Sequence, residues 1–175
     1  MGDKVFNVLF LCTGNTARSI LAEALLRHVA KGRFNAYSAG SKPKGSVNPL
    51  ALKVLKAMDV STDGLSSKGW EAFAGPDAPV MDFVFTVCDS VAGETCPLWP
   101  GQPLTAHWGI EDPAMVVGTD LEKEAAFVTA ARYLAHRINA FANLPMSSLD
   151  KISLKTKLTE IGRGEGASGP RMGAA

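Results

Sequence analysis

The chain has 175 residues, 46% of them hydrophobic and 20% charged, which suits one globular domain with a sizeable core. A formal net charge of +1 gives no reason to expect nucleic acid or a membrane as a partner. The sequence has no apolar stretch long enough to span a membrane and no signal-peptide pattern, so we expect a cytoplasmic protein. Three cysteines in such a protein favour catalysis or redox chemistry over structural disulfides.

The hydrophobic pattern predicts short strands and amphipathic helices that follow one another along the chain. The expected strands are residues 5–11, 34–39, 81–87 and 104–107. The expected helices are residues 18–31, residues 49–58, a short one near Trp70 and Phe73, and a long one that starts after a capping box at Thr119 and Glu122 and ends near residue 141. Residues 89–103 are rich in glycine and proline and are expected to form an irregular loop.

The first strand leads directly into the segment Cys12-Thr13-Gly14-Asn15-Thr16-Ala17-Arg18-Ser19. On a turn between a strand and a helix, this spacing of thiol and guanidinium lets one loop curl around a tetrahedral oxyanion. Gly14 permits unusual backbone angles, so successive N–H groups can point inward, and the helix that follows adds its positive end. Arg18 supplies a planar set of donors for two oxygens. The same field is expected to lower the pKa of Cys12, and Ser19 is expected to donate its hydroxyl to that sulfur.

The oxyanion loop has a simpler alternative, because a cysteine at the end of a strand is commonly just a small buried hydrophobic residue. The spacing Cys-x5-Arg is weak evidence alone, but the strand before it, the Gly and Asn inside it and the helix after it favour the oxyanion loop. A Walker-type phosphate loop is excluded, because no Gly-Lys-Ser/Thr follows the glycine.

Residues 12–19 resemble the loop of the low-molecular-weight tyrosine phosphatases and of the arsenate reductases built on the same fold. Three further segments are similar to the thioredoxin-coupled arsenate reductases: residues 86–97, which include Cys88 and Cys96, then His107-Trp108-Gly109, and Asp112-Pro113-Ala114. The resemblance extends over residues 5–141 and implies an α/β fold with a four-stranded parallel sheet flanked by helices. It departs at Thr16, where Ser is usual, at Ala17, where a further cysteine is often present, and in a slightly longer spacing between Cys88 and Cys96.

The three cysteines acquire roles through this resemblance. In an open parallel sheet, ligands bind beyond the carboxyl ends of the strands, so Cys12 and Cys88 are expected to face the same site. Reduction of arsenate to arsenite consumes two electrons, and two thiols must therefore end as a disulfide. The resemblance implies that Cys12 attacks arsenate held by the loop and Arg18, that Asp112 protonates the departing oxygen, and that Cys88 and then Cys96 complete a disulfide relay. Asp112 lies in an Asp-Pro pair, which is also typical of a turn.

The resemblance also implies the partners of the reaction. Thioredoxin is expected to reduce the disulfide by thiol exchange, and glutathione with glutaredoxin is the alternative reductant. No tightly bound cofactor is expected. In some related reductases, a potassium ion binds at positions that match Asn15, Glu23 and Ser38, so potassium near these residues is a further implication, although Glu23 is otherwise an ordinary carboxylate on a helix.

Two other functions compete with arsenate reduction. A low-molecular-weight protein tyrosine phosphatase needs only Cys12, Arg18 and Asp112, but its relatives place aromatic residues after the Asp-Pro pair, where this chain has Ala114 and Met115. Residual phosphatase activity is still expected, because the loop discriminates poorly between phosphate and arsenate. A redox-sensing or arsenite-binding protein without catalysis would have no use for an oxyanion loop or a general acid.

The domain boundary is placed near Pro145. We expect residues 1–145 to form the phosphatase-like domain and residues 146–175 to form an extension. Residues 149–161 have the spacing of a short amphipathic helix. Residues 162–175 are rich in Gly and Ala without periodicity, so they are expected to be disordered.

Overall fold

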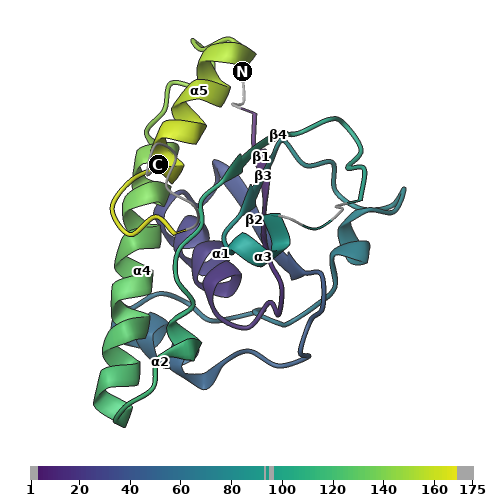
Figure 1. The fold of residues 1–175 in the computed structure, drawn as a ribbon. Helices are drawn as coiled ribbons and strands as arrows, with labels where there is room; N and C mark the ends of the chain where they lie inside the picture. The colour runs from purple at the N-terminus through teal and green to yellow at the C-terminus, as the bar shows by residue number, and fades with distance from the viewer. Residues whose placement is uncertain (1–3, 93, 95–96, 169–175) are drawn as a thin grey trace, which may run out of the picture.

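The computed structural model describes residues 4–92, 94 and 97–168. Within them, four strands form a sheet of order β2-β1-β3-β4, in which every strand pair is parallel. The strands are β1 (Phe6–Cys12), β2 (Phe34–Gly40), β3 (Phe83–Thr86) and β4 (Leu104–His107). The α-helices are α1 (Arg18–Val29), α2 (Pro49–Ala57), α3 (Asp89–Ala92), α4 (Asp120–Ala142) and α5 (Lys151–Gly162), and the 3-10 helices are η1 (Trp70–Phe73) and η2 (Pro113–Met115). This arrangement confirms the predicted four-stranded parallel sheet flanked by helices (Figure 1).

The carboxyl ends of the strands lie side by side along one edge of the sheet. Cys12 at the end of β1 pairs with Gly40 at the end of β2. Thr86 at the end of β3 pairs with Leu11 on one side and with His107 at the end of β4 on the other. This edge is where open α/β sheets bind ligands, and the segments that follow these strands therefore converge there.

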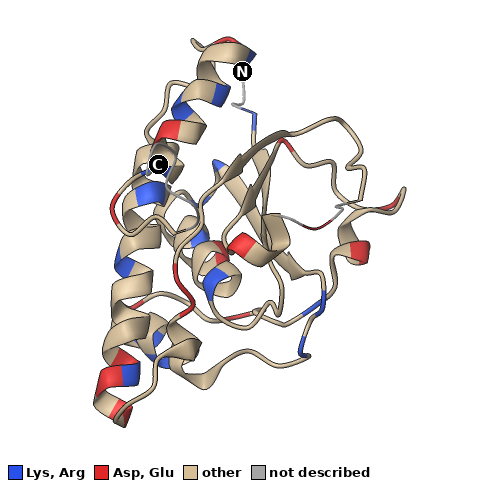
Figure 2. Cartoon of the chain, viewed as in Figure 1, with Lys and Arg blue, Asp and Glu red and all other residues tan. Residues whose placement is uncertain are grey.

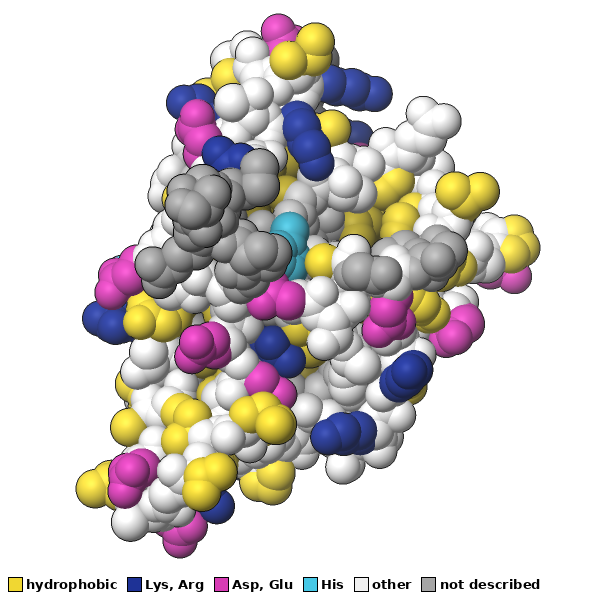
Figure 3. Space-filling view, viewed as in Figure 1, with side chains coloured by type: hydrophobic (Ala, Val, Ile, Leu, Met, Phe, Trp, Pro, Cys, Tyr) yellow, Lys and Arg dark blue, Asp and Glu magenta, His cyan; other side chains and the backbone are white. Residues whose placement is uncertain are grey.

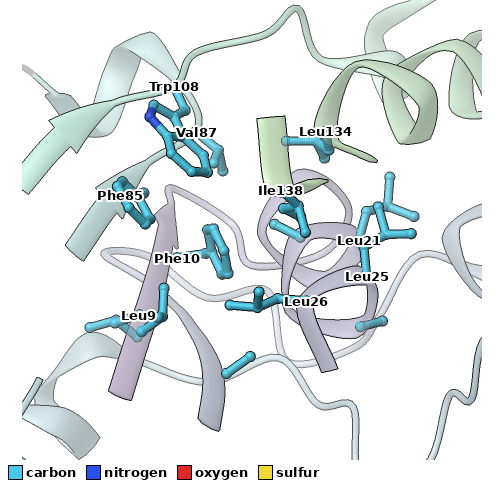
Figure 4. Close-up of a cluster of buried hydrophobic side chains, with 14 of the residues drawn as sticks. Leu9, Phe10, Leu21, Leu25, Leu26, Phe85, Val87, Trp108, Leu134 and Ile138 are labelled. Atoms are coloured by element: carbon cyan, nitrogen blue, oxygen red, sulfur yellow. The ribbon is translucent and has the colours of Figure 1, made fainter. Parts of the chain in front are cut away.

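Aromatic side chains fill the space between the sheet and α4. The ring of Phe141 on α4 lies 5.0 Å from that of Phe83 and 5.2 Å from that of Phe85, both nearly edge-on. Trp108 stacks on Phe85 with ring centroids 3.8 Å apart. Figure 4 shows Phe85 and Trp108 facing aliphatic side chains of α1 and α4. Burial of each large side chain contributes about 1.5–3 kcal/mol, so this layer is a rigid base for the loops above it.

Two predicted helix starts are confirmed, and one short helix was missed. The Asn48 side chain accepts the N–H of Leu50 at the start of α2, and Thr119 and Glu122 form a capping box at the start of α4. Helix α3 lies at the beginning of residues 89–103, which were expected to be irregular throughout. The glycines and prolines behind that expectation all follow Ala92, so they do not interrupt the single turn before them.

Helix α5 and the residues that follow it, as far as residue 168, pack against the rest of the fold. Helix α5 lies against β4, the edge strand of the sheet, and Trp108 donates its ring N–H to the carbonyl of Leu158 at 2.9 Å. Residues 163–168, expected to be disordered, return to the loop after β4, where Ala167 forms an antiparallel bridge with Ile110. Residues 169–175, for which disorder was also predicted, lie outside the described residues.

The surface carries both signs of charge in small groups. Figure 2 shows both basic and acidic residues on α4 and α5, and Figure 3 shows the two signs mixed on the face in view. This agrees with a net charge of +1. No helix in the described part of the chain is both long and apolar enough to cross a membrane.

Candidate active site

The segment after Cys12 forms a loop whose carbonyl groups point away from its centre. The carbonyls of Thr13, Gly14 and Thr16 accept the N–H groups of Lys42, Lys44 and Asn48 at 2.9, 3.1 and 2.9 Å. With these carbonyls bonded to other segments, the N–H side of the loop is left for an anion, which is the arrangement that the predicted oxyanion loop needs. Arg18 begins α1 immediately after this loop, and Ala17 before it is buried.

Asn15, and not Gly14, takes the unusual backbone conformation in this loop. Its φ is +50°, in the left-handed region that Asn tolerates better than most residues because its side chain can form compensating bonds. The buried amide donates to Ser19 Oγ at 2.8 Å and to Ser38 Oγ at 3.0 Å, and its oxygen accepts the N–H of Lys68 at 2.9 Å. Asn15 thereby connects the loop to α1, β2 and the segment before η1.

Gly14 and Ser19 have different contacts from those expected. A Cβ on Gly14 would lie 3.6 Å from the Lys44 side chain, which is an ordinary contact distance, so neither space nor backbone conformation requires glycine here. The Ser19 hydroxyl is fully buried and accepts the Asn15 amide. Among the described contacts there is no hydrogen bond from Ser19 to Cys12.

Arg18 and Asp112 meet at the carboxyl edge of the sheet. Arg18 Nη2 lies 3.4 Å from Asp112 Oδ2, and Arg18 Nη1 donates to the carbonyl of Ile110 at 3.0 Å. Asp112 also accepts the N–H of Ala114 at 3.0 Å and so starts η2. Asp112 therefore shapes the turn and also reaches the arginine of the oxyanion loop, while its role as the general acid stays a prediction.

Cys88 lies against the oxyanion loop. Its sulfur is 3.4 Å from the hydroxyl of Thr13, and it shares a hydrogen bond with Cys12. Cys12 is 4% exposed and Cys88 is 1% exposed, so neither thiol of this pair faces bulk water. The predicted neighbourhood of the first two cysteines is thus present, whereas Cys96 lies outside the described residues.

The two thiols hold one proton between them. The hydrogen bond with Cys88 is the main cause that raises the pKa of Cys12, and burial adds to it, while Arg18 acts in the opposite direction. The same bond lowers the pKa of Cys88 to about 5, with a further contribution from the Thr13 hydroxyl. Because two buried sulfurs in contact cannot both ionise at neutral pH, the pair carries a single negative charge that both sulfurs share. In the presence of Cys88 the pKa of Cys12 is therefore raised and not lowered, which differs from the sequence prediction.

This sharing predicts how the pair titrates. In Cys96→Ser protein, where the pair contributes the only thiols, ultraviolet thiolate absorbance is expected to rise with a midpoint near the Cys88 pKa of about 5. In Cys96→Ser/Cys12→Ala, Cys88 loses its hydrogen bond with Cys12, which is the main cause of its low pKa. The midpoint should therefore move up toward the ordinary thiol value. In Cys96→Ser/Cys88→Ala, the pKa of Cys12 should fall below its value in the pair, because the hydrogen bond that is the main cause of its rise is gone. An unchanged midpoint in the Cys12→Ala protein would contradict the shared proton.

A buried polar cluster lies beneath the loop, where a potassium ion was predicted. Ser38 Oγ donates to Glu23 Oε1 at 2.5 Å, and Asn15 presents its N–H groups to Ser38. Arg27 lies 2.5 Å and Lys68 lies 3.9 Å from the Glu23 carboxylate. Burial raises the pKa of Glu23 and lowers that of Lys68. The carboxylate is therefore matched by two protein cations and the amide offers a donor, so these residues do not fit a potassium ion.

Sequence reasoning missed a polar contact next to Cys88. His107 Nδ1 lies 2.7 Å from Thr86 Oγ1, and His107 Nε2 lies 2.7 Å from Asp89 Oδ1 on α3. This contact joins the end of β4 to the first residue after Cys88. The position of His107 at the carboxyl end of a strand was the one signal in the sequence that could have found it.

Comparison with known proteins agrees with this arrangement. Residues 7–150 match the family described as low molecular weight phosphotyrosine protein phosphatase. The chain belongs to this family. A relative from Oceanobacillus iheyensis named arsenate reductase is 35% identical over 142 residues, which are 81% of this chain and 97% of the relative.

Solved structures of related proteins have the same fold. One described as an arsenate reductase in the phosphate binding state has a TM-score of 0.64 at 25% identity, covering 78% of this chain and 96% of that one. A thioredoxin-dependent arsenate reductase from Corynebacterium glutamicum has a TM-score of 0.53 at 26% identity, covering 79% of this chain and 64% of that one. The family match ends at residue 150, so α5 and the residues after it lie outside the shared part.

Proposed function

We propose that this protein is an arsenate reductase that receives its electrons from thioredoxin. The observation that carries the proposal is the second thiol, Cys88, buried in contact with Cys12 beside an oxyanion loop. A phosphatase needs one nucleophile, because water completes its reaction, whereas reduction needs a second thiol within reach of the first. Relatives named arsenate reductase and a neighbour named thioredoxin-dependent arsenate reductase support this choice.

In the proposed first step, the loop and Arg18 bind arsenate, and Cys12 attacks the arsenic atom. The proton that Cys12 shares with Cys88 moves to Cys88 as the sulfur–arsenic bond forms. One arsenic–oxygen bond breaks, and Asp112 donates a proton to the departing oxygen, which leaves as water. The 3.4 Å contact between Asp112 and Arg18 keeps the acid beside the bound oxyanion.

In the second step, Cys88 attacks the sulfur of Cys12, and the proton that Cys88 received in the first step passes to an oxygen of the departing arsenite. A disulfide bond forms, the sulfur–arsenic bond breaks, and its electron pair stays on arsenic, so that arsenate has become arsenite. We further propose that Cys96 then attacks Cys88 and releases Cys12 as a thiolate. Thioredoxin reduces the resulting Cys88–Cys96 disulfide by thiol exchange, and glutaredoxin with glutathione is the alternative donor.

A tyrosine phosphatase is the competing function. Ala114 and Met115 follow the Asp-Pro pair, and Met115 is 75% exposed, so no aromatic clamp for an aryl phosphate is built there. The charge-sharing contact of Cys88 with Cys12 would serve no step of phosphate ester hydrolysis. These two observations favour the reductase.

The purified protein with thioredoxin, thioredoxin reductase and NADPH tests the proposal. Arsenate is expected to start NADPH oxidation, phosphate is expected to inhibit it, and mass spectrometry after one turnover should find the Cys88–Cys96 disulfide. Replacing thioredoxin with glutaredoxin and glutathione identifies the reductant. Absence of arsenate-dependent oxidation with either reductant, together with efficient hydrolysis of an aryl phosphate, would refute the reductase and support the phosphatase.

A further inference from the structure

The chain beyond the family match returns to the active site. Residues 163–168, which we call the C-terminal strap, follow α5 and lie beside the segment after β4 (Figure 1). Ala167 bridges to Ile110, and the N–H of Ser168 donates to the carbonyl of Gly109 at 3.0 Å. The strap therefore pairs with the backbone that leads to Asp112.

The paired segment directly holds the arginine of the oxyanion loop. The carbonyl of Ile110 accepts Arg18 Nη1 at 3.0 Å, and Asp112, two residues later, lies 3.4 Å from Arg18 Nη2. Two nitrogens of one planar guanidinium are thus oriented by a segment that the strap borders. The strap, α4 and the segment around Asp112 also line a common cleft of about 390 Å³.

A buried arginine on α4 holds the strap. Arg137 is 2% exposed, and its Nη1 donates to the carbonyls of Tyr133 and Glu165, both at 3.1 Å. Its Nη2 donates to the carbonyl of Gly164 at 3.4 Å. Burying a guanidinium without a carboxylate partner is unfavourable, and two of the three carbonyls that compensate for it belong to the strap. No carboxylate among the described residues pairs with Arg137.

Gly166 brings the strap close to α4. Its φ is +84°, and a Cβ at this position would lie 2.3 Å from the ring of Tyr133. Any other residue would have both an unfavourable backbone conformation and a clash with an aromatic ring. The strap's path over Tyr133 therefore depends on this glycine.

We propose that the C-terminal strap positions Arg18 and Asp112 for catalysis and that Arg137 is the positioning residue that holds the strap. The expected effect of the strap on catalysis rests on the proposed function, whereas its expected effect on anion binding does not. With the strap in place, the Ile110 carbonyl keeps the guanidinium plane aligned with the oxyanion loop. Without it, residues 109–112 lose their pairing on one side and Arg18 loses a fixed acceptor.

The test compares Gly166→Val with Gly32→Val in the full-length protein. Gly32 has a φ of +86°, close to that of Gly166, but no described atom lies within 4 Å of its Cβ position, so this control has the same backbone strain without the clash. Calorimetry with inorganic phosphate is expected to show about fivefold weaker binding in Gly166→Val and wild-type binding in Gly32→Val. Arg137→Lys, which cannot serve three carbonyls in the same geometry, is expected to weaken phosphate binding similarly.

Kinetics and folding complete the test. At a temperature where circular dichroism shows each variant folded, the kcat for arsenate should fall about tenfold in Gly166→Val and Arg137→Lys, because Arg18 and Asp112 are misaligned. If both variants bind phosphate as Gly32→Val does, the strap has no positioning role. If phosphate binding weakens but no variant, nor the wild type, reduces arsenate, the strap proposal stands and the proposed function fails. Should one variant not fold, the other decides.

Discussion

Replacing Cys12 by serine is expected to lower arsenate reduction by thioredoxin at least about a thousandfold. The hydroxyl is a far weaker nucleophile than a thiolate at neutral pH, and it cannot take part in a disulfide. The protein should remain folded and still bind phosphate, because the loop, Arg18 and Asp112 are unchanged. The measurements are NADPH oxidation with saturating thioredoxin and calorimetry with inorganic phosphate.

Cys88→Ser is the matched comparison, because it also replaces one sulfur by oxygen, in the side chain next to Cys12. Here Cys12 can still form its bond to arsenic, but the second sulfur is missing, so turnover with thioredoxin should be lost as well. Mass spectrometry should then find an arsenic adduct on Cys12 in Cys88→Ser and none in Cys12→Ser. Normal turnover of Cys88→Ser with thioredoxin would remove the relay while leaving Cys12 as the nucleophile.

The parts of the site that depend on neighbouring residues could be predicted from the sequence. The spacing of Cys12 and Arg18 on a turn between β1 and α1 predicted the oxyanion loop, because a single continuous segment builds it. The meeting of Arg18 with Asp112 was also predicted, although they are far apart in the chain. A parallel sheet brings the residues after its strands to one edge, and this rule needs only the strand positions.

The hydrogen bonds that individual side chains form with distant segments could not be predicted. Asn15 takes the left-handed conformation because Ser38 and Lys68, from other elements, satisfy its side chain. The sequence predicted that Cys12 and Cys88 face one site, but it did not predict that Cys88 shares a proton with Cys12 and so raises the pKa of Cys12. The strap looked disordered because its residues are small and aperiodic, but its order comes from backbone groups that meet Arg137 and Ile110.

The oxyanion loop also depends on a close approach that involves no catalytic side chain. Gly40 ends β2 opposite Cys12, and its N–H donates to the carbonyl of Lys68 at 2.9 Å. A Cβ on Gly40 would lie 2.4 Å from the carbonyl oxygen of Thr13 and 3.1 Å from the nitrogen of Asn15. Both are backbone atoms of the loop, so a methyl group cannot be accommodated by rotating a side chain.

Gly40→Ala is therefore expected to displace the loop while keeping every side chain of the proposed mechanism. Because a shift of about 1 Å in a site that positions a reacting group lowers the rate about a hundredfold, we expect kcat/KM for arsenate to fall by about that factor. Overpacking of this kind destabilises a protein by about 1–3 kcal/mol, so the melting temperature should fall by several degrees. Gly75→Ala is the matched control, since no described atom lies within 4 Å of its Cβ position, and it should leave both quantities unchanged.

The comparison of Gly40→Ala with Cys12→Ser separates the two things that the loop does. Cys12→Ser removes the nucleophile and keeps the oxyanion site, so phosphate should bind and arsenate should not react. Gly40→Ala keeps the nucleophile and disturbs the oxyanion site, so phosphate binding should weaken together with the rate. If Gly40→Ala bound phosphate and reduced arsenate like the wild type, the backbone of residues 13–17 would not hold the substrate, and Arg18 and Asp112 would have to do so alone.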